Sequence, residues 1–171
     1  MQKIQNVKNI ALLLLVLITA ALAGALILQY VYGFAPCHLC MLERIPYYFA
    51  LFFVLPLLLF LSFSIYLPLC RIFFAFIFVL FSADFVLSFY HMGAEYKWWA
   101  GPAACSSQHS HLVANTSVLL QSLKRAPDKV ACDVAPFYLL NLSPAGWNML
   151  LCLLLMMLAF YGIRTLRGPS L

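Results

Sequence analysis

Four long apolar runs constrain the fold of this chain more than any other feature of its sequence. They extend over about residues 10–31, 45–63, 72–90 and 145–162. A helix needs about 20 apolar residues to cross about 30 Å of hydrocarbon, so each run suits one span. The chain is 65% hydrophobic and only 9% charged, which soluble globular domains do not show. The sequence therefore predicts an all-α membrane protein, a bundle of four transmembrane helices forming one domain over residues 1–171.

The start of the chain also resembles a secretory signal. Lys3 and Lys8 precede the first apolar run, and "ALA" at residues 21–23 could be a cleavage site. The apolar region of a signal peptide is about 7–15 residues long, whereas this run continues well past Ala23. We expect it to remain uncleaved as the first span.

The positive charges indicate the orientation. Four spans put both termini on the side of the turn at residues 64–71, and the ten Lys and Arg residues divide equally between the two sides. On the terminal side they lie in short tails and a short turn, whereas on the other side most lie in the long loop at about residues 92–143. The positive-inside rule weights charges close to span ends. We therefore expect cytoplasmic termini, with the loops at about 32–44 and 92–143 on the outer side.

This orientation places four of the six cysteines on the outer side: Cys37, Cys40, Cys105 and Cys132. Such a distribution suits disulfide chemistry in an oxidising compartment. Cys70 and Cys152 lie in apolar sequence, and we expect them to be buried and inert.

The Cys-x-x-Cys of "APCHLCMLERIPYY" lies where the outer loop meets the second run. If the helix begins near Cys40, that thiol lies at the positive end of the helix dipole, which favours the thiolate. Arg44, four residues further, shares a helix face with Cys40. Its guanidinium could stabilise the thiolate, or the negative charge that develops on an oxygen accepting electrons. The alternative is an interfacial anchor that reaches lipid headgroups or pairs with Glu43.

A polar face marks the third run. Asp84, Ser88 and His91 are spaced four and three residues apart, so they share one face of a helix that cannot comfortably look into lipid. Asp84 is either functional or a protonated group hydrogen-bonded to another helix, and the residues leave both readings open.

The long loop carries the second pair of cysteines. Trp98 and Trp99 are typical of the membrane interface. An apolar periodicity from Ser110, ended by Pro127, predicts a short amphipathic helix between Cys105 and Cys132. A bond between these cysteines could serve redox chemistry on a mobile loop or staple a passive connector.

Three functions fit these residues before any family is considered. One is an oxidoreductase that passes electrons between thiols and a lipid-soluble acceptor, and another is a structural protein with stapling disulfides. The third is a metal site or transporter, with candidate ligands Cys37, His38, Cys40, His109 and His111. An arginine beside the Cys-x-x-Cys makes that a poor place for a divalent cation, so we expect no metal.

Three stretches in order resemble the bacterial disulfide-bond-formation protein B (DsbB) family, quinone reductases of the inner membrane. They are "PCHLCMLERIPYY", "FYHMGAEYKWWAGPAAC" and "CDVAPFYLLNLSPAGWNMLLCLLL", and the resemblance covers nearly the whole chain. The vitamin K epoxide reductase type also combines a helix bundle with quinones, but its Cys-x-x-Cys lies late in the chain.

The DsbB resemblance implies a four-helix bundle that reoxidises DsbA, a periplasmic thioredoxin-fold oxidase. By that resemblance Cys105 accepts attack by the DsbA thiolate, and Cys132 is released to attack Cys37. Cys40 then becomes the thiolate that meets the quinone.

The resemblance also implies a bound quinone, ubiquinone or menaquinone. It makes Arg44 and His91 the cofactor-binding residues, with His91 carried by the family's Tyr-His-x-Gly motif. Asp84 matches no family motif.

Overall fold

The computed structural model describes residues 2–63, 67–102 and 131–167. Its four long helices are α1 (Gln2–Tyr30), α2 (His38–Ser62), α3 (Leu67–Glu95) and α5 (Pro144–Arg167). All four are long and apolar enough to cross a membrane. The expected four-helix membrane bundle is therefore confirmed, whereas the short amphipathic helix expected from Ser110 lies outside the described residues.

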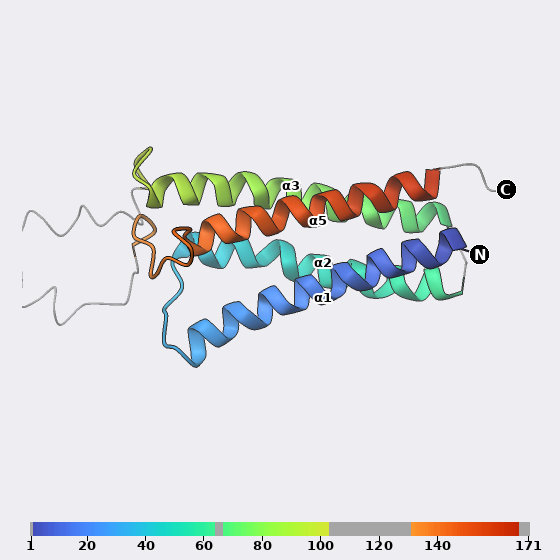
Figure 1. Cartoon of the computed structure of the whole chain (residues 1–171), viewed down its shortest axis with the longest axis horizontal. Coiled ribbons are helices and arrows are strands. Elements are labelled where there is room, and N and C mark those ends of the chain that lie inside the picture. Colours follow the sequence, from blue (N-terminus) through green and yellow to red (C-terminus); the bar gives the residue numbers. More distant parts are fainter. Residues whose placement is uncertain (1, 64–66, 103–130, 168–171) are drawn as a thin grey trace, which may run out of the picture.

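The helices lie side by side along one axis (Figure 1). The start of α1 and the end of α5 lie at one end of the bundle, as a chain with four spans requires. The connection from α1 to α2 and the segment before α5 lie at the other end, which we call the loop end. The most extensive helix contact joins α3 to α5.

The packed core belongs mainly to the end of the bundle away from the loops. Phe74, Ile77 and Phe81 of α3 are fully buried there. The buried residues of α1 stop at Leu22, and the last turns of α1 diverge from the other helices (Figure 1). The bundle is therefore closed by apolar packing at one end and more open on the α1 side at the loop end.

Trp99 closes the loop end of α3. Its indole Nε1 donates to the carbonyl oxygen of Tyr90 at 2.9 Å, and its ring stacks on Tyr90 with a centroid distance of 6.0 Å. A Cβ on Gly93 would lie 1.9 Å from Trp99 Cζ2. Only glycine at this position leaves room for the ring.

Helix α2 begins two residues earlier than the expected start near Cys40. Cys37 is its N-cap, with an extended backbone (φ −72°, ψ 171°), and its sulfur accepts a hydrogen bond from the Cys40 N–H at 3.1 Å. The sulfur that directly meets the positive end of the helix is therefore that of Cys37. Cys40 lies in the first turn of α2, so it is near the positive end of the helix as expected, and the Cys37 side chain caps that end.

The polar face of α3 is confirmed as an interior face. Asp84, Ser88 and His91 are all at most 1% exposed. The two cysteines expected in apolar surroundings, Cys70 and Cys152, are also fully buried.

Candidate functional site

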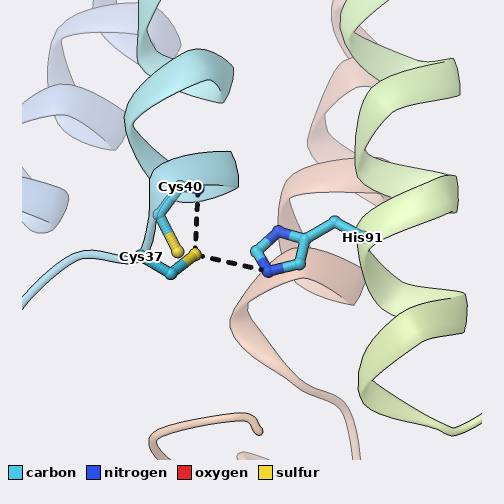
Figure 2. Close-up of side chains that lie close together, drawn as sticks. All are labelled: Cys37, Cys40 and His91. Carbon is cyan, nitrogen blue, oxygen red and sulfur yellow. Dashed lines mark hydrogen bonds between the residues drawn. The ribbon is translucent and has the colours of Figure 1, made fainter. Parts of the chain in front are cut away.

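The Cys-x-x-Cys of α2 faces His91 of α3 (Figure 2). Cys37 Sγ lies 3.5 Å from His91 Nε2, and the Cys40 side chain turns its sulfur toward that of Cys37 (Figure 2). Both cysteines are free thiols in this structure. Two thiols and an imidazole thus meet where the loop becomes helix.

Two carboxylates flank His91. Its Nδ1 lies 2.8 Å from Glu43 Oε1, and its Nε2 lies 3.8 Å from Glu95 Oε1. Glu43 and Glu95 are 7% and 6% exposed, so both are shielded from solvent. A buried carboxylate on Nδ1 orients the imidazole and fixes which ring nitrogen carries the proton.

A chain of polar side chains continues from Glu43 into the bundle. Asn148 of α5 donates to Glu43 Oε2 at 3.3 Å and to Ser88 Oγ at 2.7 Å. Tyr47 donates to Asn148 Oδ1 at 2.6 Å, and its hydroxyl lies 3.7 Å from Cys152 Sγ. Each of these hydrogen bonds stabilises the bundle, because an unpaired polar group inside a membrane has no water as an alternative hydrogen-bond partner.

The chain ends at Asp84. Cys152 Sγ donates to Asp84 Oδ2 at 3.1 Å, which joins α5 to α3. Of the two roles that the sequence left open, a carboxyl group hydrogen-bonded to another helix fits this contact. Cys152 is buried as expected, yet it is a hydrogen-bonding partner rather than only a packing residue.

A cavity of about 510 Å³ opens beside the thiols, between α1, α2 and the start of α5. Cys40, Arg44 and His91 line it, and most of the remaining wall is apolar, with Leu28, Phe137 and other aliphatic or aromatic side chains. Pockets that bind small molecules combine apolar walls with a few polar groups in this way.

Arg44 reaches across to α1 instead of pairing with its neighbour Glu43. One guanidinium nitrogen donates to Gln29 Oε1 at 2.5 Å and the other to the carbonyl oxygen of Ala25 at 3.4 Å. These contacts hold the charge on the cavity wall.

Cys132 lies against the Cys-x-x-Cys. It is 1% exposed and forms a small buried cluster with Cys37 and Leu39, against which Cys40 packs. Next to it, Lys97 donates to the carboxylate of Asp133 at 2.7 Å and to the Asp133 carbonyl oxygen at 2.6 Å. These bonds tie the segment that carries Cys132 to the end of α3.

The model of the family described as disulfide bond formation protein DsbB matches residues 7–162 of the 171. The chain belongs to the DsbB family. No curated protein and no solved structure gives a match. Its family and its four spans identify this DsbB protein as a multi-pass membrane oxidoreductase of disulfide bond formation.

In this DsbB chain the pKa of the Cys37 thiol is raised above its ordinary value. The main cause is a hydrogen bond with the Cys40 side chain, and burial adds to it. When the reduced pair loses one proton, the Cys37 thiol therefore stays protonated. That leaves Cys40, which lines the cavity, as the candidate for the charged sulfur.

The residues that sequence reasoning selected meet at one end of the DsbB bundle. Cys37, Cys40, Cys132 and His91 lie together, and Arg44 shares the cavity with two of them. Cys105 lies outside the described residues. Glu43 and Asn148 were not selected as site residues, because a charge next to an arginine and a single amide near a span end carry no distinctive pattern.

Proposed function

We propose that this protein is a disulfide:quinone oxidoreductase that reoxidises a DsbA-type partner in the periplasm. Two electrons pass from the partner to the Cys105–Cys132 pair, then to the Cys37–Cys40 pair, and finally to quinone. The observation that carries the proposal is the position of Cys132, which is buried against Cys37 while Cys40 lines an apolar cavity.

Each step between proteins or pairs is a thiol–disulfide exchange. A thiolate of the reduced partner attacks the Cys105–Cys132 disulfide at Cys105, and Cys132 leaves. The second thiolate of the partner attacks this mixed disulfide, which closes the partner's own disulfide and releases Cys105, so two electrons and two protons have moved to the loop pair. The Cys132 thiolate then attacks Cys37, and Cys40 leaves. Cys105 next attacks Cys132, which reforms the loop disulfide and releases Cys37.

The cavity residues fit a quinone. Its wall is mostly apolar, which suits a ring with an isoprenoid tail, and Arg44 supplies a fixed positive charge beside Cys40. When bound, quinone accepts the two electrons and two protons that leave the Cys37–Cys40 thiols as their disulfide reforms. His91, held by Glu43 on one nitrogen and facing Cys37 with the other, can receive a thiol proton.

The proposed orientation follows from where the two reaction partners of the relay are found. The loop end faces the periplasm, where a soluble thiol partner can reach the loop, and the termini face the cytoplasm. The bilayer is the inner membrane, where the quinone pool lies. Ubiquinone and menaquinone are both candidates.

An anaerobic assay with purified reduced DsbA-type partner tests the relay. We expect Cys40→Ser to abolish quinone reduction, followed by its absorbance, while Cys105→Ser blocks exchange with the partner. Arg44→Met should raise the apparent KM for quinone without changing that for the partner. Full partner oxidation by the Cys105→Ser variant would refute the relay.

A further inference from the structure

We propose that the reduced Cys37–Cys40 pair and His91 form a redox-gated binding site for a thiophilic divalent cation, with Zn²⁺ as the fitting ion. The site differs from the one considered from sequence alone, because its histidine comes from α3 and not from the Cys-His-Leu-Cys motif.

The donor atoms are spaced for zinc. The two sulfurs and one imidazole nitrogen all lie within 4.8 Å of one another, and Cys37 Sγ lies 3.5 Å from His91 Nε2. In a tetrahedral site with Zn–S bonds of about 2.3 Å and Zn–N bonds of about 2.0–2.1 Å, neighbouring sulfur and nitrogen are about 3.5 Å apart. The described residues therefore approach zinc geometry without a rearrangement of the helices.

The surroundings of His91 are those of a metal ligand. Glu43 Oε1 lies 2.8 Å from Nδ1, so the carboxylate holds the imidazole with Nε2 toward the sulfurs. Asn148 fixes the other Glu43 oxygen at 3.3 Å. A carboxylate behind a histidine in this way orients metal-ligating imidazoles and raises their basicity.

The local charge also favours a cation. Glu95 Oε1 lies 3.8 Å from His91 Nε2, and Glu95 Oε2 is buried without a hydrogen-bond partner among the residues that the structure describes. The positive charge of Arg44 is tied to Gln29 on α1, and two thiolates neutralise the charge of Zn²⁺. The arginine that argued against a cation from sequence alone is therefore not an obstacle.

Binding depends on the redox state. Zn²⁺ displaces one proton from each thiol, so two protons are released and no electrons move. In the disulfide state both sulfurs are used by the S–S bond and the site does not exist. Three protein ligands leave a fourth position for water, and Cys40 and His91 both line the cavity. In the proposed relay, on which this consequence alone rests, bound zinc would hold the pair reduced and inhibit turnover.

Zinc binding to the full-length protein in detergent tests the site without quinone or partner. A failure to bind zinc therefore leaves the proposed relay standing, and a failure of the relay leaves the zinc site standing. Cys105→Ser and Cys132→Ser are combined as the background, which removes the loop thiols. The reduced protein is titrated with Zn²⁺ against a chromophoric chelator, and Co²⁺ then reports thiolate ligation through its charge-transfer absorption. We expect one ion per reduced chain and none per oxidised chain.

Substitutions assign the ligands. Cys37→Ser and Cys40→Ser should each weaken binding at least 100-fold. Glu43→Gln, which keeps the shape of the side chain, should weaken it about 10- to 100-fold, as should His91→Ala. His38→Ala is the matched control, because His38 lies in the motif but is exposed, and it should leave the affinity unchanged.

Circular dichroism confirms that each variant keeps its helices. Equal zinc binding by oxidised and reduced protein would overturn the proposal. So would a His38→Ala variant that loses affinity while His91→Ala and Glu43→Gln retain it, or cobalt spectra without thiolate bands.

Discussion

The Cys37 side chain makes three contacts. Its sulfur caps α2, lies 3.5 Å from His91 and packs against Cys132. Each contact depends on the sulfur standing at the end of a helix, where the backbone turns from loop to bilayer. The Cys37 thiol therefore lies between Cys132 and the cavity thiol, Cys40.

The raised pKa of Cys37 predicts how the reduced protein responds to alkaline pH. The ordinary value for a cysteine thiol is 9.0, and in the folded protein the pKa is higher. Above pH 9 the unfolded chain releases this proton while the folded chain keeps it, so stability falls as pH rises. The slope from one proton is at most about 1.4 kcal/mol per pH unit.

Thermal unfolding in detergent between pH 7 and 10 measures this effect. Reduced wild type should lose stability above pH 9 more steeply than reduced Cys37→Ala, and both should be flat below that pH with respect to this group. Identical slopes for the two proteins would contradict the assignment to Cys37.

A larger side chain at position 93 is predicted to disturb the packing of Trp99. Gly93→Ala would place a Cβ 1.9 Å from Trp99 Cζ2, so the indole must leave its stack on Tyr90. We expect a loss of about 1–3 kcal/mol, as for other overpacked sites. Gly24→Ala is the matched control, because nothing lies within 4 Å of its added Cβ, and its melting temperature should not fall. Equal melting temperatures for the two variants would exclude this role of Trp99.

The helices α3 and α5 are joined by polar as well as apolar contacts. At one end Phe74 covers Gly162, where a Cβ would lie 2.6 Å from the ring. Near the middle Cys152 donates to Asp84, and closer to the loop end Asn148 donates to Ser88. Small residues and buried hydrogen bonds are what hold helices together in a bilayer, where lipid tails compete equally for apolar side chains.

The contact between Cys152 and Asp84 predicts different effects of two similar substitutions. Cys152→Ala removes the donor and leaves a buried carboxyl oxygen unpaired, at a cost of about 1–3 kcal/mol. Cys152→Ser keeps a donor and should cost less. Melting temperatures in detergent rank the two, and an alanine variant as stable as the serine variant would show that the contact contributes nothing.

The bundle as a whole brings the segment that carries Cys132 and an apolar cavity to one thiol pair, Cys37 and Cys40. In the proposed relay this proximity matters, because the electron donor is a thiol protein in water and the acceptor is a quinone in the bilayer. Cys132 packs against Cys37 and Leu39, and Lys97 ties its segment to the end of α3. The last turns of α1 diverge from the other helices (Figure 1).

Substitution of Lys97 tests how far the position of Cys132 beside Cys37 depends on the contact between Lys97 and Asp133. Lys97→Met removes both hydrogen bonds to Asp133. The ion pair is largely exposed on the lysine side, so the free energy of unfolding should change by less than about 1 kcal/mol. If the proposed relay operates, turnover with the partner should nevertheless fall about 10-fold, because Cys132 is less often positioned for attack on Cys37.

Steady-state assays distinguish this effect from a general loss of charge. Arg71→Met removes one positive charge near the far end of the bundle and serves as the control. The KM for quinone should stay constant in both variants. A Lys97→Met enzyme as fast as Arg71→Met would mean that the ion pair does not position Cys132.

The sequence by itself determined the four spans, the interior face of α3 and the place of the Cys-x-x-Cys at a helix start. Hydropathy and helical period are properties of neighbouring residues, so Asp84, Ser88 and His91 could be assigned to one buried face without a structure. The order in which the cysteines act is implied by the family motifs and stays a prediction.

Only the tertiary structure decided which polar groups pair. Glu43 lies against His91, Arg44 binds Gln29 on α1, and Cys152 donates to Asp84. Such pairs join residues up to 105 positions apart, and they depend on how each helix is rotated and on which helices are neighbours. Local sequence does not encode those rotations, because they result from packing of the whole bundle.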